Sequence, residues 1–252
     1  MINLSMLDSH VHLSQSVTSF DPHKIYFINS VDSSDWMILQ DISSKHQNII
    51  PFYGIHPWYI QKTGDSDLQK LEVLLNQNDA ALVGEIGLDR IKAKKDPVQF
   101  SLDKQIYYFK EQLKLALKYR RGVSIHCVKA WEELFAVLKE LHQLIGKDFK
   151  AILHYFNGSV QIMNRLIKQG FFISFFPNLN EQKNPKTFQA FQLCPLDKMF
   201  LESDRYIGES EKYIVAHYQN VSLLKKMNFA DLKKRMLING EIFTNRALAG
   251  KR

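Results

Sequence analysis

A pair of histidines near the start of the sequence has the spacing of a metal site. His10 and His12 belong to the segment Asp8-Ser9-His10-Val11-His12, which follows a short apolar run. Because side chains alternate along a β-strand, the two imidazoles project from the same side and can converge on one cation. Two histidines at a strand end that bind no metal would give the same pattern. Further ligands are therefore needed before a metal centre is predicted.

Other residues with nitrogen or oxygen donors end further apolar runs. Glu85 lies in ALVGEIGL, His126 in GVSIHC and His154 in KAILHYF, and Asp204 follows MFLES. A buried carboxylate is costly unless a cation or hydrogen-bond donors compensate it. An internal salt bridge is the alternative role for Glu85. A hydrogen-bonded structural role is the alternative for the others.

Short runs rich in branched and aromatic residues recur along the chain and alternate with segments of helical spacing, which is the βαβ pattern. Between the runs, Phe100, Ile106, Phe109, Leu113 and Leu117 recur every three to four residues, as in an amphipathic helix. The predicted strands are Ser5 to His10, Lys24 to Ser30, Ile49 to Ile55, Ala80 to Ile86, Gly122 to Cys127, Lys150 to Phe156, Phe171 to Phe176 and Lys198 to Ser203. The predicted helices include Pro97 to Tyr119 with Pro97 in its first turn, Lys129 to Ile145, Val160 to Lys168, a weaker stretch from Glu209, and Asn228 to Leu248.

Eight strands alternating with helices in 252 residues predict an α/β fold, a single (β/α)₈ TIM barrel over residues 1–252. The sequence contains no repeat or linker that would separate domains. An open doubly wound sheet is the competing fold. Such a sheet usually has a glycine-rich phosphate loop after its first strand, where this chain has DSHVHL.

In a TIM barrel the carboxyl ends of the strands meet at one rim, where active sites form. His10, His12, Glu85, His126, His154 and Asp204 would all lie there. Four imidazoles and two carboxylates exceed the three protein ligands usual for one catalytic zinc, so two divalent ions fit better. Glu85 could bridge ions about 3.5 to 4 Å apart. Without a thiolate ligand, Zn²⁺, Mn²⁺, Mg²⁺ and Fe²⁺ all remain possible.

The chain contains an ordered set of motifs: Asp8 to His12, Gly54-Ile55-His56-Pro57-Trp58, Gly84-Glu85-Ile86-Gly87-Leu88-Asp89, Gln112-Leu113 with Ala116, His126, His154-Tyr155-Phe156-Asn157-Gly158 and Glu202-Ser203-Asp204. From about residue 7 to about residue 246, this set resembles the TatD family of metal-dependent DNases. The resemblance implies that His10, His12, Glu85 and Asp204 hold one ion, and that Glu85, His126 and His154 hold the other. It also implies a TIM barrel and hydrolysis of phosphodiesters, often at DNA ends.

The sequence departs from the family pattern at one position near His126. In that family an arginine commonly stands two residues after the histidine that corresponds to His126, whereas this chain has Val128 there. The segment after Asp204 also differs from the family pattern, because it reads Arg205-Tyr206-Ile207 where small residues and a proline are usual. We hypothesise that Lys129 or Arg205 supplies the missing positive charge to the substrate phosphate. The alternative is that both are solvated surface cations.

Two residues after the third predicted strand are candidates for substrate contact. His56 could approach the substrate rather than a metal, with a packed loop histidine as the alternative. Trp58 could stack on a splayed base. Cys127 follows His126 and should point away from it, as a small buried apolar residue.

Composition narrows the protein class. The chain has 33 Lys and Arg against 26 Asp and Glu, a formal charge of +7, which favours anionic partners without requiring them. Its two cysteines are too few to staple the chain and favour a reducing cytoplasm. The N-terminus lacks a secretory pattern, and no run of about 18 apolar residues indicates a membrane span. No partner protein is indicated.

These features together predict a deoxyribonuclease, an exonuclease acting on single-stranded DNA ends through a water activated by divalent ions. Glu85 and Asp204 would be catalytic, with Asp204 orienting or deprotonating the water. The enzymatic alternative is a hydrolase of a small amide, lactone or phosphoester, since the same barrel supports many reactions. The non-enzymatic alternative is a barrel that only binds nucleic acid, and the presence of all six ligands argues against it.

Overall fold

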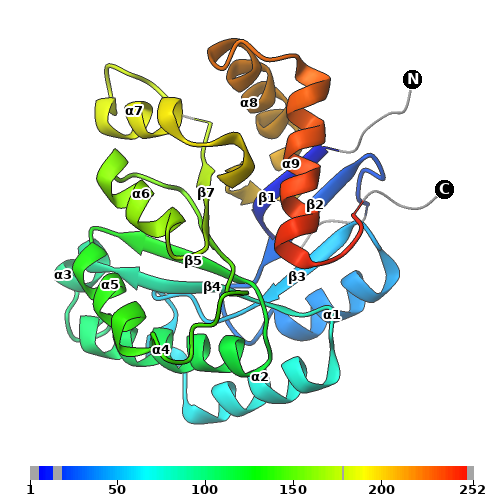
Figure 1. Cartoon of the computed structure of the whole chain (residues 1–252). Helices are drawn as coiled ribbons and strands as arrows, with labels where there is room; N and C mark the ends of the chain where they lie inside the picture. Colours follow the sequence, from blue (N-terminus) through cyan, green and yellow to red (C-terminus); the bar gives the residue numbers. More distant parts are fainter. Residues whose placement is uncertain (1–5, 14–18, 178, 249–252) are drawn as a thin grey trace.

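A computed structural model describes residues 6–13, 19–177 and 179–248, in which parallel strands form one curled sheet surrounded by helices (Figure 1). The hydrogen-bonded strand order is β8-β7-β6-β5-β4-β3-β2-β1-β9. The strands are β1 (Met6–His12), β2 (Lys24–Asn29), β3 (Ile49–Tyr53), β4 (Leu82–Asp89), β5 (Val123–Val128), β6 (Ala151–Leu153), β7 (Phe171–Phe175), β8 (Met199–Leu201) and β9 (Arg205–Tyr206). Each predicted strand overlaps an observed one. The first predicted strand starts at Ser5, which lies outside the described residues.

The sheet closes because the chain continues past the eighth predicted strand to a second partner. Strand β8 pairs with β7, and β9, which lies beyond that predicted strand, pairs in parallel with β1. Across this seam the Asp204 amide donates to the His10 carbonyl at 3.1 Å, and the Ser203 amide donates to Asp8 Oδ1 at 2.9 Å. The two edges of the sheet therefore meet, which confirms the predicted α/β barrel.

Helices cover the outer face of the sheet (Figure 1). They are α1 (Trp36–Lys45), α2 (Asp65–Gln77), α3 (Arg90–Lys95), α4 (Leu102–Lys118), α5 (Trp131–Glu140), α6 (Val160–Ile167), α7 (Pro185–Leu193), α8 (Ser210–Leu224) and α9 (Phe229–Thr244), with short 3₁₀ turns η1 (Ile60–Lys62) and η2 (Leu196–Lys198). Among the described residues, no helix is long and apolar enough to cross a membrane.

The placement of Pro97 in the first turn of a helix is wrong. Helix α4 begins at Leu102, after Ser101. Pro97 lies in the preceding turn, which is closed by hydrogen bonds from the Gln99 amide to Asp96 Oδ1 and from the Phe100 amide to the Asp96 carbonyl. The apolar spacing itself is confirmed, because Phe109 and Leu113 are buried against the sheet.

Apolar side chains fill the amino end of the barrel and leave the carboxyl end to polar groups. Phe27, Phe52, Phe172 and Phe200 project inward from four strands and pack around Phe243 of α9. Two residues further along these strands the inward positions become polar at Asn29, Ser174 and Glu202. Strand alternation thus builds an apolar floor beneath a polar layer.

Candidate metal centre

Glu85 lies at the centre of the polar layer, and its two carboxylate oxygens face different histidines. Oε2 is 3.2 Å from His10 Nε2 and 3.6 Å from His12 Nε2. Oε1 is 2.9 Å from His126 Nδ1 and 2.7 Å from His154 Nε2. Only 3 % of the Glu85 side chain is exposed. A carboxylate between two groups of imidazoles has the arrangement of a bridging ligand.

Asp204 completes the cluster from the seam of the barrel. Its Oδ1 is 3.5 Å from His12 Nε2 and 4.0 Å from His10 Nε2, and 25 % of its side chain is exposed. His10, His12 and Glu85 form one compact donor group, and His10, His154 and Asp204 form another. The structure therefore brings together all six residues that the sequence predicts as ligands.

The hydrogen bonding of the imidazoles fits a cation at their centre. His12 Nδ1 lies 3.0 Å from the Asn29 carbonyl, so it donates its proton there and leaves the Nε2 lone pair free. His154 Nδ1 faces Glu202 Oε1 at 3.4 Å, which leaves Nε2 directed at Glu85 Oε1. When His154 carries its proton on Nδ1, Nε2 and Glu85 Oε1 are two acceptors 2.7 Å apart, and a cation or an added proton between them would satisfy both.

The ionisation of the cluster indicates the same need for positive charge. Burial opposes ionisation of Glu85, yet the His154, His56 and His10 imidazoles hold its pKa well below the usual range. Burial disfavours protonated His154, but the Glu85 and Glu202 carboxylates raise its pKa well above the ordinary value. Without metal the cluster therefore holds a proton on His154, which a divalent ion would replace.

Carboxylates without a predicted role orient two of the histidines. Glu202 is fully buried, accepts the Tyr155 amide at 2.7 Å and faces His154. Asp89 Oδ2 lies 3.6 Å from His126 Nε2 and accepts Trp58 Nε1 at 2.8 Å. A charged residue at the end of a buried strand was the available signal for both, since such a group needs a partner.

His56 lies against the cluster but is set up as a donor. Its Nδ1 accepts the Trp58 amide at 3.1 Å, so a neutral ring carries its proton on Nε2, which is 3.3 Å from Glu85 Oε1. Burial lowers the pKa of His56 to about 4, so the ring is neutral. His56 also falls in a compact group with Glu85 and His126, but this tautomer has no free lone pair on Nε2 for a metal.

The other substrate candidates lie around the rim. Trp58 is 44 % exposed, with its ring centroid 6.5 Å from that of His126. Lys129 is exposed in a left-handed turn after β5. The Arg205 guanidinium lies 4.6 Å from the ring centroid of Tyr213. Cys127 is buried, as predicted, and burial raises its pKa to about 12.

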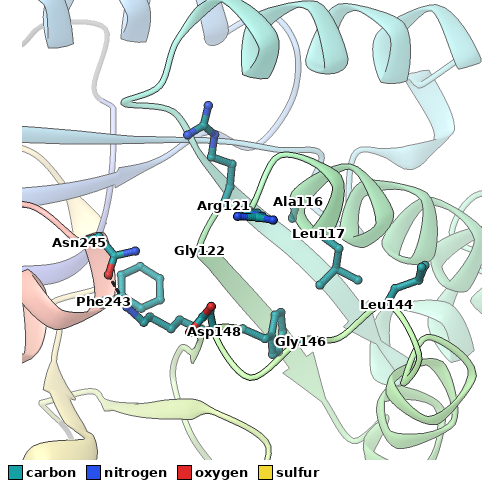
Figure 2. Close-up of a pocket in the computed structure, with 12 residues that line it drawn as sticks. Ala116, Leu117, Arg121, Gly122, Leu144, Gly146, Asp148, Phe243 and Asn245 are labelled. Carbon is teal, nitrogen blue, oxygen red and sulfur yellow. Dashed lines mark hydrogen bonds between the residues drawn. The ribbon is translucent and has the colours of Figure 1, made fainter.

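A separate pocket of about 320 Å³ lies at the opposite end of the barrel, before β5 and β6 (Figure 2). Two of its cationic side chains, Arg121 and Lys150, are engaged in structural contacts. Arg121 donates to the Leu75 carbonyl and to Asp79, and Lys150 donates to the Ile242 carbonyl and to Asn245. These bonds anchor chain segments at the ends of α2 and α9, which is a structural role.

The chain is similar in sequence to three curated relatives. An uncharacterized metal-dependent hydrolase of Haemophilus influenzae is 29% identical over 219 residues, which cover 80% of this chain and 81% of that protein. The deoxyribonuclease Tat-D of Schizosaccharomyces pombe is 29% identical over 210 residues, or 79% of this chain and 64% of that protein. The 3'-5' ssDNA/RNA exonuclease TatD of Erwinia tasmaniensis is 28% identical over 152 residues, or 60% and 56%.

The fold and the sequence point to one family. The crystal structure of YjjV, a TatD homologue from Escherichia coli, superposes with a TM-score of 0.81 and 20% identity over 97% of this chain and 100% of that one. A sequence profile of the family described as TatD related DNase matches residues 7–243. The chain therefore belongs to the family of TatD-related DNases.

Proposed function

We propose that this chain hydrolyses phosphodiester bonds at the ends of single-stranded DNA, using two divalent ions. As a member of its family it is a metal-dependent hydrolase that acts on ester bonds. The observation that carries the two-ion proposal is Glu85, whose oxygens face His10 and His12 on one side and His126 and His154 on the other. One ion alone would leave one of these groups without a cation.

The residues around Glu85 support hydrolysis by a water molecule. Divalent ions bound there would lower the pKa of a water and neutralise charge on the reacting phosphate. Asp204 is partly exposed and ionised, because contacts with His12, His154 and His10 outweigh burial and hold its pKa far below the usual range. Its ionised carboxylate can orient the attacking water, and it can accept that water's proton once a bound ion has made the water more acidic. His56 can donate a hydrogen bond from its Nε2–H group to a phosphate oxygen.

Nucleic acid is the substrate best supported by charge and by the relatives. The formal charge of +7 favours a polyanion. The Erwinia relative is named for single-stranded DNA and RNA, and Trp58 offers an exposed ring beside His126. Zn²⁺, Mn²⁺ and Mg²⁺ all suit the nitrogen and oxygen donors.

We infer that phosphate recognition is altered relative to the family pattern, because Val128 stands where that pattern commonly has an arginine. We propose that Lys129 or Arg205 supplies the charge. Lys129 is exposed just after β5, and Arg205 follows Asp204 in β9. Hydrolysis rates of Lys129→Ala and Arg205→Ala that both equal that of the wild type would rule this out.

We also propose that residues 1–252 work as one barrel domain in the cytoplasm. The single sheet, whose two edges meet, supports one domain. Cys127 and Cys194 are free and buried, as in a reducing compartment.

The deciding experiment incubates metal-stripped protein with end-labelled single-stranded DNA and adds Mg²⁺, Mn²⁺ or Zn²⁺ separately. We expect stepwise shortening that one of these ions restores, and that a variant with both Glu85→Ala and His126→Ala lacks. If no ion supports cleavage although metal is bound, a hydrolase of small amides, lactones or phosphoesters becomes the better assignment.

A further inference from the structure

A hollow of about 430 Å³ opens beside the metal centre on the side of His12. This volume falls within the range of small-molecule sites. His12 belongs to both places, because its ring lines the hollow while its Nε2 faces Asp204 and Glu85. A group held in the hollow would therefore be next to the reacting phosphate.

Two tyrosines form the aromatic part of its lining. Tyr206, from β9, is 57% exposed, and its ring centroid is 6.2 Å from that of His12. Tyr59, from the loop after β3, is half-buried. Both tyrosines line the same hollow as Asp32 and Asp35. Such rings can stack on any base.

Two carboxylates from the loop after β2 give the hollow a negative charge. Asp32 Oδ1 accepts the Ser34 amide at 2.8 Å, and Asp35 Oδ2 accepts the Val31 amide at 3.2 Å. The second oxygen of each carboxylate has no hydrogen-bond partner within residues 6–13, 19–177 and 179–248. Within the same ranges no lysine or arginine lines the hollow, although the chain as a whole is basic.

This lining repels a phosphate and favours a flat group that donates hydrogen bonds. We propose that the hollow binds the base of the terminal nucleotide, and that Asp32 and Asp35 favour bases with an exocyclic amino group over thymine. Amino groups of cytosine, adenine and guanine can donate to a carboxylate. Thymine has no amino group and presents a single N3–H between two carbonyl oxygens, which a carboxylate repels. This inference rests on the proposed nuclease function and specifies its substrate.

The first test compares single-stranded DNAs with a common interior whose three terminal nucleotides at both ends are all cytosine or all thymine. We expect the initial rate to be about tenfold higher for the cytosine ends. Asp32→Asn places an amide donor in the hollow, so the cytosine-to-thymine ratio of rates should fall toward one or invert. Asp41→Asn, at an exposed acid of α1, is the matched control and should keep the wild-type ratio.

The second test measures binding without turnover. In equilibrium dialysis against the metal-free protein we expect deoxycytidine to bind more tightly than thymidine. Tyr206→Ala should weaken deoxycytidine binding about tenfold, and Tyr206→Phe should restore it because the ring is kept. Equal binding of both nucleosides, or no effect of Tyr206→Ala, would overturn the base pocket.

The two proposals fail in different ways. A wild-type protein that hydrolyses neither DNA ends nor bis(4-nitrophenyl) phosphate refutes the nuclease function. Hydrolysis of DNA with a cytosine-to-thymine ratio of one, or with a ratio that Asp32→Asn leaves unchanged, refutes only the base pocket. A high ratio that Asp32→Asn abolishes supports both.

Discussion

Individual side chains of the centre differ in what they can do because their surroundings differ. Glu85 is enclosed by imidazoles and has 3 % of its side chain exposed, so it is suited to holding metal. Asp204 has 25 % exposed and opens to solvent, so it can meet a water molecule. The difference in burial therefore suits Glu85 to metal binding and Asp204 to proton transfer.

Asp204→Asn should reduce kcat about 10² to 10⁴-fold, because the amide cannot accept the proton of the attacking water. Its size is nearly unchanged, and five other predicted ligands remain, so the fold and much of the metal occupancy should persist. Hydrolysis rates of end-labelled DNA, with metal content by mass spectrometry, would measure this. Near-normal turnover would exclude proton transfer by Asp204.

His217 of α8 is a buried histidine outside the metal centre. Its Nε2 donates to the Phe175 carbonyl at 2.8 Å, and its buried Nδ1 has no hydrogen-bond partner among the described residues. Burial lowers its pKa to about 4. The His217 side chain of α8 meets the Phe175 carbonyl of β7, and the spacing of residues in the sequence does not reveal this contact.

The pKa of His217 predicts how stability changes with pH. Between pH 4 and 6.5 the unfolded chain binds a proton that folded His217 does not. The free energy of unfolding should therefore fall as the pH drops through this window, by up to about 3 kcal/mol. Urea unfolding at pH 7 and 5 should show a smaller loss for His217→Gln than for the wild type. The exposed control His142→Gln should behave as the wild type, and equal losses in all three proteins would contradict the assignment.

At the scale of elements, α4 holds the ends of two strands in place through buried glutamines. Gln112 Oε1 accepts the Ile55 amide at 2.7 Å, and its Nε2 donates to the Ile55 carbonyl at 3.2 Å. Gln105, seven residues earlier on the same face, makes the same pair of bonds with Asp89. One helix thereby fixes the backbone beside His56 and at Asp89.

Gln112→Leu should remove both bonds and leave the buried Ile55 amide and carbonyl unpaired. Each such group costs about 1–3 kcal/mol, so the free energy of unfolding should fall by about that amount or more. The displaced His56 should also lower turnover. Urea unfolding and DNA hydrolysis would be compared with Gln69→Leu, an exposed position of α2. A loss below about 0.5 kcal/mol would show that α4 does not hold this segment.

At the scale of the whole molecule, the metal centre ties distant strands together. Its six predicted ligands come from β1, β4 and β5, from the end of β6 and from the seam between β8 and β9. Metal binding should therefore stabilise the entire barrel rather than one loop, because these ligands are apart in the unfolded chain.

Saturating metal should raise Tm. At a free concentration about 100 times Kd the gain is about 2.7 kcal/mol, which corresponds to roughly 5–11 °C for a chain of this size. Thermal unfolding with and without Zn²⁺, Mn²⁺ or Mg²⁺ would measure it. Glu85→Ala should lose most of the rise and the exposed control Glu181→Ala should keep it. A rise that survives Glu85→Ala would place the stabilising ion elsewhere.

The sequence by itself determined the strand positions and which residues meet at the metal centre. Apolar runs mark buried strands, and polar residues at their carboxyl ends collect at one rim of a parallel barrel. His126 and His154 could be placed in this way because their strands alternate regularly. The family resemblance added the division into two ion sites.

Only the tertiary structure decided how the first and fourth strands present their ligands. Strict alternation from the inward-facing Leu7 would turn His10 outward, yet His10 reaches Glu85 because β1 shifts register between Asp8 and Val11. A similar shift lies in β4 between Val83 and Ile86, on either side of Glu85. Register depends on pairing with neighbouring strands, which a local pattern does not encode. The hollow beside His12 is likewise not encoded by any local pattern, since its walls come from separate loops that only the closed barrel brings together.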